Sequence, residues 1–227
     1  MRKGELKKKA ILETAESLFL EKGYQETAID EILSRLSTSK GSLYHHFESK
    51  QQILEEICRE KMLASAEEYH LQIPDDPLAA LDRLLYCAQP LRNGKEALLL
   101  MLLPILNTPD GDTTLCSMQR VQKQIFYPEL EKILFQLRSD RSAFWTPEYL
   151  PVLAWDLFLA GQQTLLSVSR ALCGKTTEAP TLALSIDAMR FAWERLLDLP
   201  YGSMTIVRAE EALSCVYHTA QHFKYLS

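Results

Sequence analysis

The sequence predicts an all-α protein, with a small helical head at the amino terminus and a larger helical body. Apolar residues recur at helical spacing along almost all of the 227 residues, and no segment alternates as a half-buried strand would. Clusters of turn-forming residues divide the chain into segments of helix length. We expect the head to span residues 1–50 and the body residues 51–227.

The head begins with two predicted helices. The first ends at Gly23, since glycine readily adopts the left-handed backbone that stops a helix. Thr27 is the expected N-cap of the second, with Asp30 three residues later, close to a capping box. Ser37 and Thr38 form a polar turn before a third helix, expected over 39–47. The apolar stripes of the first two helices are Ala10, Ile11, Ala15, Leu18 and Phe19, and Ile29, Ile32, Leu33 and Leu36.

The third predicted helix is dense in hydrogen-bond donors. Its sequence is Ser39-Lys40-Gly41-Ser42-Leu43-Tyr44-His45-His46-Phe47, in which only Leu43 and Phe47 are clear apolar anchors. Phosphates and base edges of DNA are recognised by side chains of these polar types. A solvated helix in an ordinary bundle would also be polar, but the density of donors favours nucleic-acid binding.

Further capping signals place the remaining helices. Ser49 with Gln52 predicts the start of a long helix that links head and body. Asp76 can cap the next helix, and Pro77 suits its first turn. The other helices of the body are expected near 77–91, 95–106, 113–138, 147–173, 180–198 and 204–222.

The helices near 147–173 and 180–198 are apolar on more than one face. A helix of this kind must be covered on more than one face. One face can pack on the core of its own subunit, and the other then requires a second copy of the chain. We therefore expect a homodimer through these two helices; the alternative is a centrally buried helix in a monomeric bundle.

Charge is distributed unevenly along the chain. The net charge is −5, yet residues 1–50 are near neutral and a basic cluster lies at the amino terminus. DNA would repel the acidic body, so contact with DNA would be made through the basic cluster and the head. A frayed, solvated tail is the other interpretation of the cluster, which comprises Arg2, Lys3, Lys7, Lys8 and Lys9.

Cysteine spacing and hydropathy exclude several classes of protein. The cysteines are scattered and have no metal-ligand spacing, so each is expected to be a small buried residue in a reducing compartment. The apolar run 97–106 contains Pro104 and is too short to cross a bilayer. Glu13 and Glu16 interrupt any secretory core. We expect a cytoplasmic protein without membrane contact, cofactor or metal; its cysteines are Cys58, Cys87, Cys116, Cys173 and Cys215.

The first ~55 residues resemble the DNA-binding domain of the tetracycline-repressor (TetR-like) family of bacterial transcription regulators. The resemblance rests on the helix ending at Gly23 and Tyr24, on the segment 27–32, and above all on 39–47 followed by Ser49 and Lys50. One departure is the turn Leu36-Ser37-Thr38, which lacks the glycine usual in the family. Loss of that glycine could strain the turn and change the angle of the recognition helix.

The resemblance implies a helix-turn-helix head, a dimer on operator DNA, and a body that senses a small-molecule effector, with repression as the usual outcome. Residues 39–46 would enter the major groove. Lys40 would meet a guanine edge or a phosphate, Ser42 would meet base edges, and Tyr44 and His45 would contact the flanking phosphates. Thr27 and Lys50 would form anion sites at helix starts. The expected DNA-binding residues are Thr27, Ser39, Lys40, Gly41, Ser42, Tyr44, His45 and Lys50.

No effector-binding residue can be assigned from the sequence, because an aromatic or amide side chain at helical spacing is more often part of the core. The side chains considered are Tyr86, Gln122, Tyr127, Trp145, Trp155 and Gln163.

Two other functions compete with a regulator. An enzyme is disfavoured, since no nucleophile elbow, phosphate loop, zinc-binding helix or redox cysteine pair is present. His218 and His222 lie four residues apart, but no third ligand is indicated. The other alternative is a helical interaction protein whose head has lost DNA binding.

Overall fold

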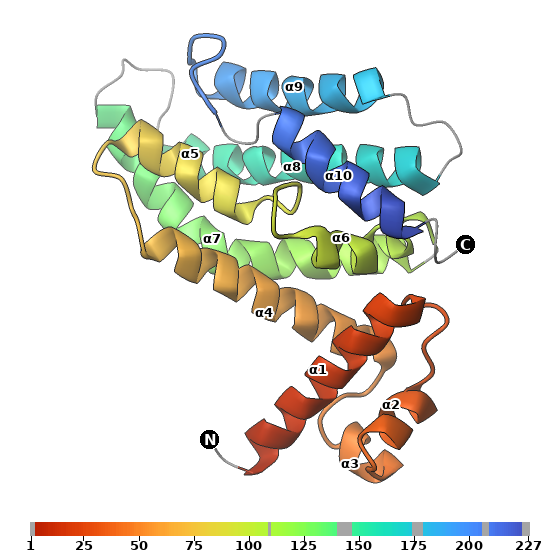
Figure 1. The fold of residues 1–227 in the computed structure, drawn as a ribbon. Coiled ribbons are helices and arrows are strands. Elements are labelled where there is room, and N and C mark those ends of the chain that lie inside the picture. The colour runs from red at the N-terminus through yellow and green to blue at the C-terminus, as the bar shows by residue number, and fades with distance from the viewer. Residues whose placement is uncertain (1–2, 109, 140–146, 174–178, 206–208, 224–227) are drawn as a thin grey trace.

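The computed structural model describes residues 3–108, 110–139, 147–173, 179–205 and 209–223. Within these ranges the regular structure is entirely helical, which confirms the all-α prediction. In chain order (Figure 1) the elements are α1 (Lys3–Lys22), α2 (Ile29–Arg35), α3 (Lys40–Tyr44), α4 (Lys50–His70), α5 (Pro77–Ala88), α6 (Glu96–Leu102), η1 (Ile105–Asn107), α7 (Gly111–Ser139), η2 (Pro147–Tyr149), α8 (Leu150–Cys173), α9 (Ala179–Leu196) and α10 (Ala209–Phe223).

The helices α1, α2 and α3 form the head, and α4 runs from the head into the body (Figure 1). In the predicted apolar stripe of α1, Ile11, Ala15, Leu18 and Phe19 are buried and Ala10 is half-buried, and α1 packs with α4. Since α4 begins at Lys50, the expected boundary between residues 50 and 51 falls at its start, and the division into two domains stays a prediction. The core residues of the head include Ile11, Ala15, Leu18, Phe19, Ile32, Leu43, Phe47, Ile53, Leu54 and Ile57.

Three predicted helix boundaries are confirmed by their capping bonds. Gly23 has φ +90°, and its N–H donates to the carbonyl of Phe19 at 2.9 Å. The Ser49 hydroxyl accepts the N–H of Gln52 at 3.1 Å. The Asp76 carboxylate accepts an N–H at 2.7 Å from the first turn of α5.

Other boundaries differ from the prediction. The expected helix 95–106 is divided, because Pro104, which lies between α6 and η1, has no N–H to donate and its ring obstructs the preceding turn. The expected helix spans 204–222, whereas α10 spans Ala209–Phe223. Met204 and Thr205 are not helical, and their N–H groups donate to the carboxylates of Glu194 and Asp82, each at 3.0 Å.

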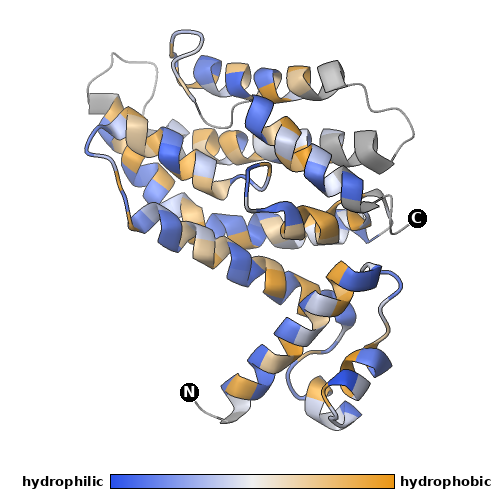
Figure 2. Cartoon of the chain, viewed as in Figure 1, coloured by the Kyte–Doolittle hydropathy of each residue, from blue (hydrophilic) through white to orange (hydrophobic). Residues whose placement is uncertain are grey.

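In the body, α7 packs against α4, α5 and α8, while α9 packs between α8 and α10. Hydrophobic residues recur along all of these helices (Figure 2). Within the described segments, no helix has both the length and the low polarity needed to cross a membrane.

The expectation that every cysteine is buried is wrong for Cys116. Its side chain is exposed near the start of α7, whereas Cys58, Cys87 and Cys215 are buried. Burial raises the pKa of Cys58 to about 12, so this thiol stays protonated and unreactive at neutral pH. The side chain of Cys173 lies outside the described residues.

Candidate DNA-binding site

The short helix α3 is anchored from one side only. Its N-cap Ser39 accepts the N–H of Ser42 through its hydroxyl at 3.3 Å. The side chain of Leu43 is fully buried, and Phe47, just after the helix, is 2% exposed. The helix is shorter than the expected 39–47, since it ends at Tyr44 with His45 as its C-cap. Two deep anchors therefore fix α3 to the head and leave its other face to solvent.

That other face carries most of the expected DNA-binding residues. Ser39, Lys40, Gly41, Tyr44 and His45 are exposed, and Tyr44 has 45% of its surface in solvent. The ammonium of Lys40 lies 6.0 Å from the centre of the Tyr44 ring. The side chain of Ser42, also on α3, is half-buried. The structure thus brings six of the eight expected residues together on and beside α3.

Thr27 lies elsewhere. It is 1% exposed, and its hydroxyl donates to the carbonyls of Gly23 at 2.8 Å and Leu18 at 3.3 Å. The prediction that Thr27 caps α2 is wrong: Ala28 is the N-cap, and its N–H donates to the Glu31 carboxylate at 2.8 Å. The hydroxyl of Thr27 holds the end of α1 against the start of α2.

Lys50 joins the start of α4 to the same loop. Its ammonium donates to the main-chain carbonyls of Tyr24 at 2.7 Å, Gln25 at 3.2 Å and Thr27 at 2.9 Å. It also lies 4.4 Å from the centre of the Tyr24 ring. These bonds use all three N–H groups of the ammonium. Burial lowers the pKa of Lys50.

In the turn between α2 and α3, a residue other than glycine adopts the left-handed backbone conformation that glycine usually adopts. Ser37 has φ +48°. Its N–H donates to the carbonyl of Ser34 at 3.1 Å, and the N–H of Thr38 donates to that of Leu33 at 3.0 Å. This pair of bonds is the Schellman motif, which usually requires glycine at the left-handed position. The turn therefore keeps its geometry, and the strain expected from the missing glycine is concentrated at Ser37.

Lys8, from the basic cluster at the amino terminus, lies close to the segment that contains α3 and Phe47. Lys8 forms an ion pair of 2.5 Å with Glu56 of α4, and its ammonium lies 5.7 Å from the centre of the Phe47 ring. Hydrogen bonds from Arg59 and Lys8 lower the pKa of Glu56 to about 2. At least one lysine of this cluster thus holds α1 to α4, which the sequence does not reveal because the two residues are 48 positions apart.

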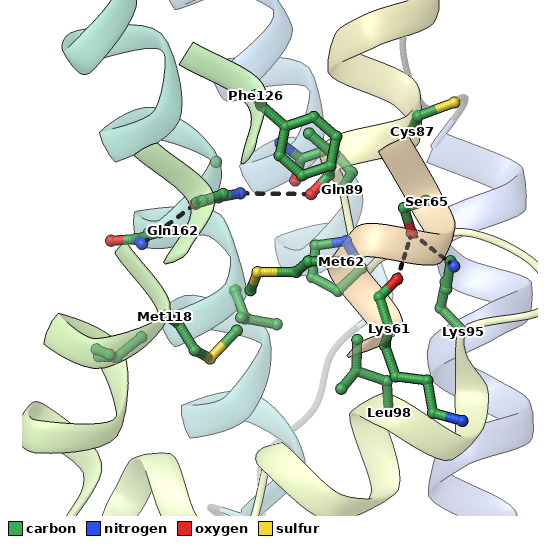
Figure 3. A pocket seen from close by; sticks show the side chains of 16 residues that line it. Lys61, Met62, Ser65, Cys87, Gln89, Lys95, Leu98, Met118, Phe126 and Gln162 are labelled. Atoms are coloured by element: carbon green, nitrogen blue, oxygen red, sulfur yellow. Dashed lines mark hydrogen bonds between the residues drawn. The ribbon is translucent and has the colours of Figure 1, made fainter. Parts of the chain in front are cut away.

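The body encloses a cavity between α4, α5, α7 and α8 and the segment that follows α5 (Figure 3). Of the side chains considered from the sequence, Gln122 lines it. Tyr86 and Tyr127 instead donate their hydroxyls to Glu211 and to the carbonyl of Pro151, both at 2.8 Å. Trp145 lies outside the described residues. Among the residues that are described, no three His, Cys, Asp or Glu side chains gather as metal ligands would.

The amino-terminal head matches known DNA-binding regulators in sequence. The family model for "Bacterial regulatory proteins, tetR family" matches residues 11–57. The TetC protein of transposon Tn10 from Escherichia coli is 30% identical over 125 residues, which are 55% of this chain and 55% of TetC. IcaR, the negative transcriptional regulator of the biofilm operon icaADBC in Staphylococcus aureus (strain Newman), is 45% identical over 52 residues, 23% of this chain and 28% of IcaR. The chain therefore spans about half the length of TetC and about a quarter of IcaR in these matches.

Solved structures share the fold over most of the chain. A TetR-family transcriptional regulator from Pectobacterium atrosepticum has a TM-score of 0.56 at 17% identity, covering 88% of this chain and 99% of that one. GusR from Salmonella enterica has a TM-score of 0.54 at 18% identity, covering 87% and 98%. Sequence identities this low establish the fold alone. The head, over residues 11–57, thus matches the tetR family of bacterial regulatory proteins, and most of the chain shares the fold of these solved structures.

Proposed function

We propose that the chain is a DNA-binding transcriptional regulator, most simply a repressor, that inserts α3 into the major groove of operator DNA. The observation that carries this proposal is the asymmetry of α3: Leu43 and Phe47 are at most 2% exposed, while its polar side chains face solvent. A recognition helix needs this combination, because base edges are read by exposed donors on a rigidly held helix.

Within this proposal the eight expected residues have two kinds of role. Those on and beside α3 contact DNA: Lys40 at a base edge or a phosphate, Ser42 at base edges, and Tyr44 and His45 at phosphates, while Gly41 allows close approach. Thr27 and Lys50 hold the loop that orients α2 and α3, as their bonds to main-chain carbonyls suggest. A protein with this function would act in the cytoplasm.

We propose further that the chain acts as a homodimer through the helices near 147–173 and 180–198. The inner stripes of both are buried, including Leu157 on α8 and Trp193 on α9. Outward, Val152 is 57%, Leu184 67% and Phe191 49% exposed, an apolar surface that a second copy would cover. A two-fold dimer would present two copies of α3 to half-sites one helical turn apart, about 34–36 Å.

DNA binding is tested by electrophoretic mobility of the full chain on the DNA upstream of its own coding region, with a salt titration. We expect a shift that weakens steeply with salt, because phosphate contacts release counterions. Lys40→Ala and Ser42→Ala should relax base preference by about 1–3 kcal/mol for each base-edge hydrogen bond that the substitution removes. Tyr44→Phe should weaken binding to all sequences equally. No binding even at low salt would instead support a helical interaction protein.

Dimerisation is tested by sedimentation of Phe191→Glu, which places a charge on the proposed interface and should yield single copies. Phe135→Glu is the matched control, since Phe135 is 59% exposed on α7 and is not part of that surface. A wild-type chain that sediments only as a monomer would contradict the proposed interface.

We also propose that a small-molecule effector controls DNA binding. The complex of RolR with resorcinol has a TM-score of 0.51 at 16% identity to this chain. It shows only that a protein of this fold can bind a small molecule. An effector can release DNA only if it prefers the non-binding conformation. The control for any candidate compound is therefore a variant that binds DNA normally but is no longer released from DNA by that compound.

A further inference from the structure

The cavity in the body has apolar walls and little free space. Its volume is about 30 Å³, which is enough for about two water molecules. Two of its wall residues are methionines, whose flexible side chains can move to admit a larger guest. The apolar residues of the wall include Met62, Leu98, Leu115, Met118, Phe126 and Leu165.

One polar group in this cavity has no partner. Gln89 is 3% exposed, and its side-chain carbonyl oxygen meets no hydrogen-bond donor among the described residues. A buried acceptor without a donor has lost the hydrogen bonds that it made with water, and it needs a donor that a bound molecule or a water molecule can supply. Gly161 of α8 faces this carboxamide: a Cβ there would lie 2.5 Å from its nitrogen. Because Gly161 has no side chain, the carboxamide of Gln89 can lie at the cavity wall.

The charge on the cavity wall is positive. Lys95 is half-buried, and its ammonium donates to the hydroxyl of Ser65 at 2.7 Å (Figure 3). No carboxylate of the described residues forms an ion pair with it, whereas the other lining cation, Lys61, pairs with Glu16 of α1 at 2.6 Å. Burial lowers the pKa of Lys95, the charge of Arg92 acts in the same direction, and the charge of Glu68 opposes them.

We propose that this cavity binds a small, mostly apolar organic acid that also carries a hydroxyl group. The acid would pair with the ammonium of Lys95, the hydroxyl would donate to the side-chain oxygen of Gln89, and the apolar body would lie among the methionine, leucine and phenylalanine side chains. This inference deepens the proposed function, since such an acid would be the effector, and it rests on that function only for its regulatory consequence.

Lys61 provides a route from the cavity to the head. It lines the cavity, and its ion pair with Glu16 joins α4 to α1. A guest that displaces the wall of α4 would act on this contact, and α1 in turn packs on α2. Occupancy of the cavity can thus change the position of the head.

The experiment is calorimetric titration of the full chain, without DNA, with the three monohydroxybenzoates and with benzoate as the probe that lacks the hydroxyl. We expect at least one hydroxybenzoate to bind about tenfold more tightly than benzoate, as one buried hydrogen bond allows. Lys95→Met should weaken that acid about tenfold or more, while Lys132→Met, which removes an exposed lysine from α7, should not. Gln89→Leu should abolish the advantage of hydroxybenzoate over benzoate.

Two outcomes would overturn the inference: no binding of any hydroxybenzoate at millimolar concentration, or binding that neither Lys95→Met nor Gln89→Leu alters. Thermal unfolding of the unliganded variants guards against misfolding, and Gln89→Leu should be at least as stable as wild type because it removes an unpaired buried acceptor. DNA binding is measured separately. A chain that binds the acid but no DNA would refute the proposed function and leave this inference standing.

Discussion

Replacing Lys50 with methionine tests whether this lysine contacts DNA or holds the head together. Methionine keeps the length and much of the apolar stem of lysine but removes the ammonium. In the structure that ammonium donates three hydrogen bonds to the loop between α1 and α2, at 2.7, 3.2 and 2.9 Å, and it lies above the ring of Tyr24. The variant therefore removes one central connection of the head.

The expected cost follows from those interactions. A hydrogen bond to a charged group contributes about 1.5–3 kcal/mol, and a cation over an aromatic ring about 0.5–1 kcal/mol. Because Lys50 is only half-buried, water replaces part of each missing bond, and the contributions do not add. We expect Lys50→Met to lower the free energy of unfolding by about 2–3 kcal/mol, which corresponds to a urea midpoint lower by roughly 1 M.

The assay combines urea unfolding with DNA binding at several salt concentrations. If Lys50 positions the loop, the variant loses stability and affinity, but the dependence of log affinity on log salt keeps its slope. Lys40→Met is the matched control: this exposed lysine is expected to meet a phosphate or a base edge, so its removal should leave stability unchanged. The salt slope of Lys40→Met should fall by about 0.9 for each phosphate that is no longer neutralised. A Lys50→Met protein of wild-type stability with a reduced slope would refute the positioning role and identify Lys50 as a phosphate-binding residue.

Three further predictions concern stability. Ser37→Gly should raise the free energy of unfolding by about 0.5–1 kcal/mol, since relief of left-handed strain exceeds the added freedom of the unfolded chain; urea unfolding should show no such gain for Ser37→Ala. The pKa of Glu56 falls from 4.5 to about 2 on folding, so its contribution to the free energy of unfolding is complete above pH 4.5 and is lost as pH falls toward 2. In urea unfolding, Glu56→Gln should therefore lose less stability than wild type as the pH falls, and identical profiles for the two proteins would contradict this. Trp193→Phe should cost about 1–3 kcal/mol, because the indole N–H donates to the carbonyl of Leu157 at 2.7 Å; an unchanged midpoint would show that this bond contributes little.

Local pattern was sufficient for much of the head. The spacing of apolar residues identified the buried stripes of α1 and α2 and the two anchors of α3, and Gly23 and Ser49 marked helix ends that the structure confirms. These features depend on residues at most four positions apart. Helix periodicity and capping act over that same range, so they can be recognised without knowledge of the fold.

The roles of Thr27 and Lys50 show where local pattern is insufficient. Both residue types suit an anion site at a helix start, which is what the sequence pattern predicts. In the structure their donors meet main-chain carbonyls, up to 26 residues away in the case of Lys50. Whether a donor faces solvent or another segment depends on how distant segments approach each other, and that information is absent from spacing along one helix.

The all-α class, the order of most helices and the polar character of α3 can be read from the sequence, because each depends on the repeat of a single helix. The left-handed Ser37, the hydrogen bonds of Lys50 to the loop and the cavity shared by Gln89, Lys95 and Gly161 cannot. The physical reason is that these features arise where separate segments meet. A cavity and its unpaired groups exist only once close packing has brought those segments together.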